Sequence, residues 1–215
     1  MDTIDWLITK CETWASGMDF KFLVQDTLLF SIGYDAGQMR LDKSSFDLLA
    51  SEIRTTVYLA VASNQCPVES WFRMGRSLVP DSFALVSWSG TMFEYLMPCL
   101  WMRFYDGTLL GRCVRGAVQE HIDYAKTLNQ EWHGVALPWG MSESAFNRQS
   151  AEGDYQYRAF GCPTVALKRG QDRDYVVAPY ASMLAMLVVP QKAMKNLLLL
   201  EHLGALGPYG FHDAV

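Results

Sequence analysis

The chain has 215 residues, half of them hydrophobic and 13% aromatic, so it is long and apolar enough to bury a large core. Its net charge of −5 and the absence of any basic cluster argue against nucleic-acid binding. The five cysteines are widely spaced and form no CxxC pair, which argues against a zinc site and favours free thiols in a reducing compartment.

The first third of the chain alternates between helical and extended patterns. Residues 2–16 carry apolar residues at helical spacing and are followed by Gly17, which predicts a helix that ends there. Aromatic and β-branched residues over 20–37 predict a short hairpin or an extended loop. Asp42 has the character of an N-cap, so a second helix is predicted over residues 42–63.

The middle of the chain is predicted to be helical between long loops. Residues 66–82 contain several helix-breaking residues and are predicted to form a loop. Helices are predicted over 90–105, with a kink at Pro98, and over 111–129. Residues 133–147 are predicted to form a loop that ends at the start of a helix.

The last third is predicted to be extended over 154–179 and then helical from about residues 179 and 191. Its most apolar stretch, residues 176–190, has only 15 residues and two prolines, whereas a membrane-spanning helix needs about 20 residues. We therefore expect a buried core helix and no membrane insertion of this segment. The whole pattern is mainly α, with long aromatic loops, and is typical of an α-helical toroid or part of one.

Glu94 is the single charged residue in the stretch "ALVSWSGTMFEYLMP", which spans residues 84–98. A buried carboxylate must be paired or protonated, so two interpretations stay open. Glu94 is either a structural acid, paired for instance with Arg54, Arg73 or Arg76, or a catalytic acid whose pKa is raised by its apolar surroundings.

Two other acids lie in aromatic loops. Glu143 follows Trp139 in "PWGMSESAFN", an arrangement typical of a sugar subsite. Alternatively, Ser142 caps a helix and Glu143 is a first-turn acid. Asp213 closes the aromatic, Gly-rich tail "GPYGFHDAV". Glycoside chemistry needs two carboxylates around one bond, and the fold can bring distant loops together.

The remaining acids and histidines carry weaker signals. Asp42, Asp47 and Glu52 are spaced by five residues, and each step turns a helix by about 140°, so at most a pair can point to one site. Solvated acids or caps are the alternative interpretation. The four histidines have no metal-ligand spacing, and no phosphate-binding loop, dinucleotide fingerprint or GxSxG motif occurs. We therefore expect no metal site.

Several ordered motifs resemble a known family. They include "MDFKFLVQDTLLFSIGYD", "LDKSSFDLLASEIR", "WFRMGR", "LVSWSGTMFEYLMP", "PWGMSESAFN", "DYQYRAFGCPTVALKRG", "VVAPYASMLAM" and "GALGPYGFHDAV". Together they resemble the glycoamylase-like region of bacterial cyclic β-1,2-glucan synthases, which is related to endo-β-1,2-glucanases.

This resemblance implies an (α/α)6 toroid that binds β-1,2-glucan or another glucose oligosaccharide and cyclises it by transglycosylation or hydrolyses it. It implies no cofactor, and a cytoplasmic location, alone or as part of an inner-membrane synthase. Residues 1–215 would form a single domain that is incomplete at its C-terminus. A non-catalytic glucan-binding or vestigial fragment is the alternative.

The resemblance also implies site residues. Glu94 and Glu143 are the first candidates for catalysis, and Asp213 is the third, although the family tail usually reads "YGFYEA" where this chain has "YGFHDA". The candidates for binding glucose units are the aromatic residues Trp88, Trp139, Tyr155, Tyr157 and Tyr180 and the basic residues Arg73, Arg76, Lys168 and Arg169.

Overall fold

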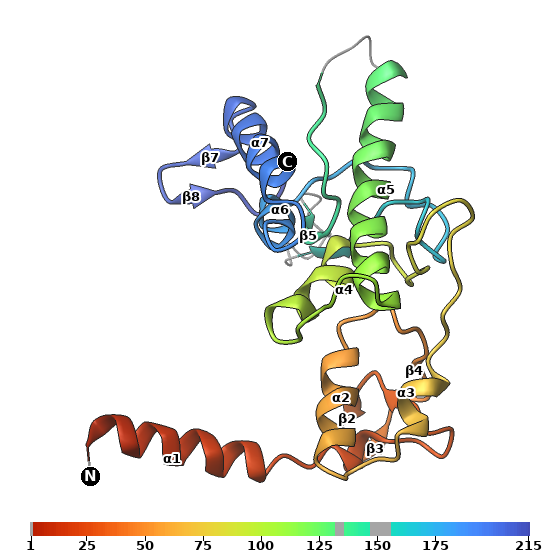
Figure 1. Ribbon diagram of the computed structural model, residues 1–215, viewed down its shortest axis with the longest axis vertical. Helices are drawn as coiled ribbons and strands as arrows, with labels where there is room; N and C mark the ends of the chain where they lie inside the picture. Colours follow the sequence, from red (N-terminus) through yellow and green to blue (C-terminus); the bar gives the residue numbers. More distant parts are fainter. Residues whose placement is uncertain (1, 132–135, 147–155) are drawn as a thin grey trace. The chain divides into compact units, whose positions relative to one another are not determined.

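The chain folds as two units in a computed structural model that describes residues 2–131, 136–146 and 156–215 (Figure 1). The first unit consists of Met1–Asp47 and Thr56–Met74, and the second of Leu48–Thr55 and Gly75–Val215. All three candidate catalytic carboxylates belong to the second unit.

The first unit begins with the predicted N-terminal helix. Helix α1 spans Thr3–Ser16 and ends at Gly17, which confirms the prediction, although none of its residues is buried. Two antiparallel strand pairs follow where a hairpin or extended loop was expected, and Phe30 of the first pair is buried. The other elements of this part are η1 (Lys21–Leu23), β1 (Phe30–Ser31), β2 (Tyr34–Asp35), β3 (Arg40–Leu41) and β4 (Ser45–Phe46).

The helix predicted over residues 42–63 is wrong in its first half. Asp42 does not cap a helix, because its Oδ1 accepts the backbone N–H of Ser44 at 2.7 Å in a local turn. Strand β4 then pairs with β1, and helix α2 begins only at Arg54 and ends at Ala62. Pairing across the sheet therefore outweighs the helical spacing of the apolar residues.

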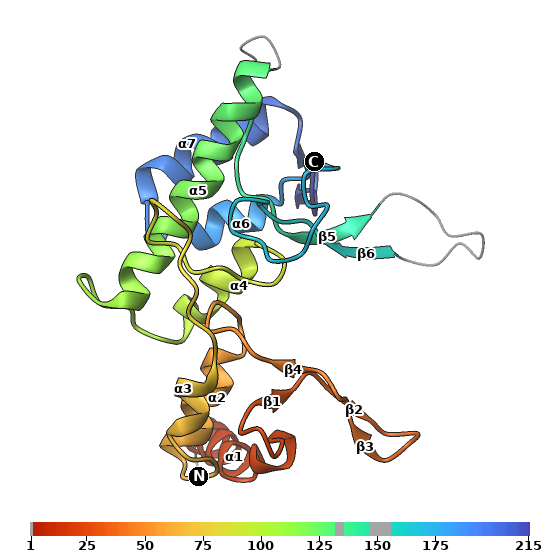
Figure 2. The same cartoon turned by 90° about the vertical axis from the view of Figure 1, so that its right-hand side faces the viewer.

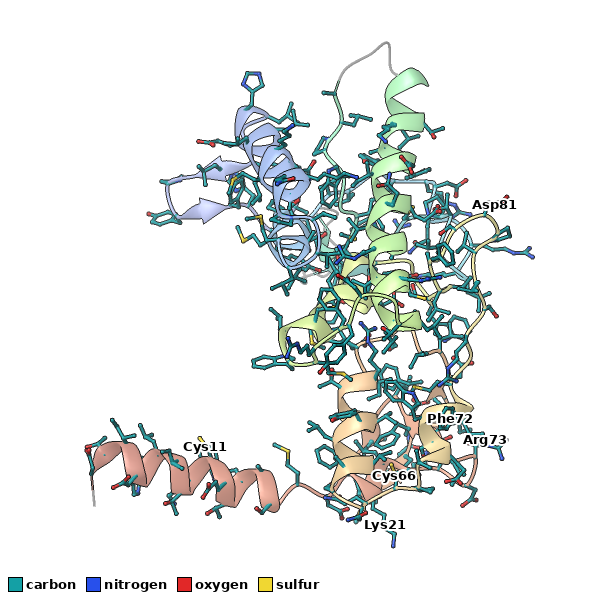
Figure 3. The ribbon with its side chains drawn as sticks, viewed as in Figure 1. Cys11, Lys21, Cys66, Phe72, Arg73 and Asp81 are labelled. Atoms are coloured by element: carbon teal, nitrogen blue, oxygen red, sulfur yellow. The ribbon has the colours of Figure 1, made fainter. Side chains whose placement is uncertain are left out.

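A short helix lies inside the predicted loop of residues 66–82. Helix α3 spans Glu69–Arg73, and the carbonyl of Pro67 accepts the N–H of Ser70 just before it. Phe72 and Arg73 lie on this helix in the first unit (Figure 3). Proline at the start of a helical turn is favoured because its missing N–H needs no partner there.

The helices of the second unit occur close to their predicted positions. The helix predicted over residues 90–105 is shorter and consists of an α-helical and a 3₁₀ part, with Pro98 in the second part, as expected for a proline that interrupts a helix. The elements are α4 (Met92–Leu96), η2 (Met97–Leu100), α5 (Leu109–Glu131), α6 (Pro179–Ala185) and α7 (Pro190–His202).

The core of the second unit lies where α4 packs on α5 and α6, and α6 packs on α7. Tyr95 of α4 is almost fully buried, and its hydroxyl donates to the carbonyl of Leu85 at 2.7 Å. Asn196 of α7 is buried and donates to the carbonyl of Trp139 at 2.8 Å and to Ser182 Oγ at 2.7 Å. These bonds satisfy the buried hydroxyl of Tyr95 and the buried side-chain amide of Asn196.

A strand replaces the helix start predicted near residue 142. Strand β5 (Glu143–Phe146) pairs antiparallel with β6 (Gln156–Ala159), and Figure 2 shows the two as a narrow ribbon. A second pair, β7 (Leu206–Gly207) with β8 (Gly210–Phe211), forms in the Gly-rich tail. The prediction of extended structure after residue 154 is thus confirmed for residues 156–159.

The described chain is helix-rich, as the mainly α prediction required. No helix among the described residues is long and apolar enough to cross a membrane. All five cysteines lie in the described ranges, and each is free, as predicted.

Candidate active site

The carboxylate of Glu94 is held by the turn that precedes its own helix. The backbone N–H groups of Thr91 and Ser89 donate to it at 2.8 and 3.1 Å, and the hydroxyls of Ser87 and Thr91 at 2.9 and 3.1 Å. Thr91 Oγ1 in turn accepts the N–H of Glu94 at 3.3 Å, which completes a capping box at the start of α4.

These contacts support the structural interpretation of Glu94. The side chain is only 6% exposed, and burial raises its pKa, while the hydrogen bonds from Thr91, Ser89 and Ser87 oppose that shift because they favour the ionised form. None of these four hydrogen bonds to the Glu94 carboxylate comes from an arginine side chain. Arg54 instead donates to the backbone carbonyls of Glu94 and Tyr95, at 2.9 and 2.5 Å.

Glu143 lies next to Glu94 across one hydroxyl. Thr91 Oγ1, which donates to Glu94, is also 3.5 Å from Glu143 Oε1. Glu143 is the first residue of β5, and its side chain is partly exposed. The fold thus brings together the first two candidate acids, which are far apart in the sequence.

The environment of Glu143 favours its protonated form. Burial raises the pKa of Glu143 to about 7, with further contributions from the negative charges of Glu52 and Glu94. A carboxylic acid that is still protonated near neutral pH can donate a proton. Glu52 lies before α2 rather than within a helix, so the spacing by five residues could not reveal its nearness to Glu143.

Two tyrosines contact the segment that carries Glu143. The hydroxyl of Tyr157, on β6, donates to Glu143 Oε2, and the Tyr157 side chain is exposed. The hydroxyl of Tyr180, on α6, lies 2.7 Å from Ser142 Oγ and 3.1 Å from the carbonyl oxygen of Glu143. Ser142 Oγ also accepts the N–H of Phe93, so it links β5 to α4 and does not cap a helix.

Asp213 supports the same strand from the other end of the chain. Its Oδ2 accepts the backbone N–H of Ala145 at 2.6 Å, although its side chain is exposed. The contact places Asp213 two residues along β5 from Glu143, so all three candidate acids belong to one region of the second unit.

The turn before Glu94 packs directly against the backbone of a second loop, at two glycines that have no side chain. A Cβ atom added to Gly161 would lie 1.7 Å from the carbonyl oxygen of Ser89, and one added to Gly90 would lie 2.4 Å from the carbonyl oxygen of Cys162. The buried side chain of Gln171 donates to the carbonyls of Ser89 and Ala159, at 2.6 and 3.0 Å. The Glu94 turn and the end of β6 are therefore fastened to one another.

The other binding candidates are dispersed. Trp88 is exposed beside this turn, and its carbonyl accepts the N–H of Lys168 at 2.8 Å. Lys168 and Arg169 are both exposed. Trp139 is instead buried, with only 8% of its surface exposed.

The remaining two arginines belong to different units. Arg73 belongs to the first unit, whereas Arg76 is partly buried in the second. Tyr155 lies outside the described residues.

A separate, largely apolar cavity of about 520 Å³ lies between α5 and the segments around residues 138 and 175. Tyr124, Leu128 and Val177 line it, and the hydroxyl of Tyr175 donates to the carbonyl of Pro138 at 2.6 Å. None of Glu52, Glu94 and Glu143 lines this cavity, so it is distinct from the carboxylate cluster.

Comparison with known proteins identifies the family. The family model described as "Glycoamylase: Putative glucoamylase" matches residues 45–215. This chain belongs to the glycoamylase family. It is 47% identical over 204 residues to the cyclic β-(1,2)-glucan synthase NdvB of Rhizobium meliloti (strain 1021), in an alignment that covers 94% of this chain and 7% of that protein. The resemblance recognised from the motifs is therefore confirmed.

Solved structures of glycoamylase-like proteins share the fold. The first is a "putative glucoamylase" from Bacteroides caccae ATCC 43185, with a TM-score of 0.71 and 15% identity. Another is the endo-β-1,2-glucanase of Chitinophaga pinensis in complex with sophorotriose and glucose, with a TM-score of 0.67 and 15% identity. Each match covers all of this chain and 54% of the other, so this glycoamylase chain spans about half the length of those structures.

Proposed function

We propose that this glycoamylase chain acts on β-1,2-glucan, breaking a glucosidic bond and passing the sugar to water or to another glucan hydroxyl. The similarity to a cyclic β-(1,2)-glucan synthase and the fold shared with an endo-β-1,2-glucanase support this substrate. The same fold similarity supports the proposal that the described helices are part of an (α/α)6 toroid. The free cysteines favour a reducing, cytoplasmic location, alone or within an inner-membrane synthase.

The observation that carries the proposal is the raised pKa of the Glu143 carboxyl group, which favours its protonated form. Its carboxyl is partly accessible, and its pKa of about 7 keeps much of it protonated near neutral pH. Cleavage of a glucosidic bond requires a proton on the leaving oxygen, and a carboxylic acid with a raised pKa supplies it. We assign this proton-donor role to Glu143.

Glu94 and Asp213 then have supporting roles. Glu94 is a positioning residue, because both of its carboxylate oxygens already accept hydrogen bonds from the turn before α4. Asp213 positions β5 through its bond to Ala145. Exposed rings beside these acids, Trp88 and Tyr157, are suited to stacking on glucose units.

The test uses the full-length protein that contains these residues, incubated with linear β-1,2-glucan. We expect shorter or cyclic products from the wild type, and a rate lower by roughly 10²–10⁴-fold in Glu143→Gln. Glu201→Gln is the matched control, because Glu201 is an exposed acid on α7. Binding of glucan without any turnover would refute the catalytic proposal and support a glucan-binding module instead.

A further inference from the structure

Glu52 lies in a segment whose two ends are fixed to the candidate active site. Ala50 forms a parallel β-bridge with Ser87, the residue whose hydroxyl donates to the Glu94 carboxylate at 2.9 Å. Arg54 donates to the backbone carbonyl of Glu94 at 2.9 Å. Glu52 is midway between these two anchor points, so its backbone is held close to the start of α4.

Among the described residues, no basic side chain forms an ion pair with Glu52. The guanidinium of Arg54 is 4% exposed and directs its N–H groups to the carbonyls of Ser51, Glu94 and Tyr95. The Glu52 carboxylate accepts the hydroxyl of Ser51 at 3.1 Å and is itself partly exposed. A neutral hydroxyl leaves the negative charge in place, whereas a bidentate arginine would offset it.

The negative charge of Glu52 acts on Glu143 and raises its pKa. Of the two acids that raise the pKa of Glu143, Glu52 contributes more than Glu94. Among the described residues, the titratable groups close to Glu143 include Glu52, Glu94, Tyr157 and Tyr180, and Asp213 binds the same strand at Ala145. Two carboxyl groups that share a site rarely both ionise, because each negative charge disfavours the other. Glu143 is therefore held toward its protonated form by its neighbours.

We propose that Glu52, held beside the start of α4, is the second carboxylate of the reaction and acts together with the proton donor Glu143. This inference rests on the proposed function. The electron pair of the breaking C–O bond stays with the leaving oxygen, which takes the proton of Glu143. The anomeric carbon becomes positive and is stabilised by the negative charge of Glu52. Water or a glucan hydroxyl then bonds to that carbon, and its proton goes to one of the two carboxylates.

The first test measures the pKa of Glu143 directly, by ¹³C NMR titration of its side-chain carboxyl in the full-length protein. Wild type, Glu52→Gln and the control Glu201→Gln are compared. Removal of the Glu52 charge is expected to lower the pKa of Glu143 from its value of about 7, while Glu201→Gln leaves it unchanged. This measurement needs no turnover, so it remains decisive if the protein proves inactive on β-1,2-glucan. An unchanged pKa in Glu52→Gln would overturn the inference.

The second test measures turnover of linear β-1,2-glucan by the same variants. Glu52→Gln is expected to lower kcat by roughly 10²–10³-fold, as removal of a charge-stabilising group does, with little change in the thermal melting temperature. If that variant unfolds, Glu52→Ala is assayed with added formate, which can replace a missing carboxylate. Rescue by formate supports the role of Glu52 at the reacting carbon. If the wild type is active and Glu52→Gln is folded and fully active, the role of Glu52 is refuted while the proposed function stands. If the wild type is inactive, the proposed substrate is refuted.

Discussion

The backbone N–H of Thr91 donates to Glu94 at 2.8 Å, and Thr91 Oγ1 accepts the N–H of Glu94 at 3.3 Å. This reciprocal pair ties the acid to the start of its own helix. Two further donors, the backbone of Ser89 and the hydroxyl of Ser87, complete its surroundings. Glu94, the single charged residue of residues 84–98, thus has its carboxylate hydrogen-bonded by the turn that precedes its own helix.

Substitution of Glu94 by glutamine is expected to destabilise the protein. The amide keeps one acceptor oxygen, but its NH₂ group must face one of the N–H or O–H donors, which loses that bond and leaves a buried donor unpaired. The free energy of unfolding should fall by about 1–3 kcal/mol in urea denaturation. Glu201→Gln is the control. A Glu94→Gln protein of wild-type stability but without activity would instead favour Glu94 as the proton donor.

The raised pKa of Glu143 predicts a pH dependence of stability. The folded protein holds the proton more tightly than the unfolded chain, whose glutamates titrate near 4.5, so folding binds protons. The stabilising contribution is therefore complete below about pH 4.5 and is lost as the pH rises through about 7. Unfolding experiments at pH 5 and pH 8 should show this loss in the wild type, and a smaller loss in Glu143→Gln. Equal losses in both proteins would contradict the assignment.

Activity should fall over the same range. If protonated Glu143 is the proton donor, kcat falls on the alkaline side with an inflection near pH 7. Tyr157 donates to Glu143 Oε2 and so stabilises the ionised form, which means that Tyr157→Phe should move this inflection to higher pH. Tyr209→Phe is the control, because Tyr209 is fully exposed. A shift to lower pH in Tyr157→Phe would show that the hydrogen bond does not act on the carboxylate.

The backbone contact at Gly161 predicts a strong effect of a single methyl group. A Cβ atom there would lie 1.7 Å from the carbonyl oxygen of Ser89, and backbone atoms cannot rotate away as a side chain can. Gly161→Ala should therefore cost about 1–3 kcal/mol or more of unfolding free energy. Gly33→Ala is the control, since no atom lies within 4 Å of the added group. Similar melting temperatures for the two variants would refute the close approach.

The sequence predicted the helices of the second unit well, because long apolar stripes such as that of α5 survive in any mainly helical fold. The sequence-based prediction was wrong where a polar side chain could either cap a helix or form a different hydrogen bond. Asp42 could cap a helix or form a local turn, and pairing of Phe46 with Phe30 decided for the turn. Ser142 could start a helix, but its hydroxyl bonds to the N–H of Phe93 instead.

The candidate site was predictable only in part. The apolar surroundings of Glu94 and the aromatic loop of Glu143 are visible in the sequence, and the structure brings the two acids together. The nearness of Glu52 depends on a β-bridge between Ala50 and Ser87, which no periodicity reveals. The backbone N–H and carbonyl of the buried Trp139 are both bound by the side chain of Asn196, a residue far along the chain, and no sequence pattern reveals this contact.

The side-chain amide nitrogen of Gln171 connects two parts of the candidate site. It donates hydrogen bonds to the carbonyls of both Ser89 and Ala159. The turn that binds the Glu94 carboxylate and the strand that carries Tyr157 are therefore joined through one side chain. For the proton transfer proposed for Glu143, this connection limits the displacement of the donor from the reacting oxygen, and a displacement of about 1 Å is costly.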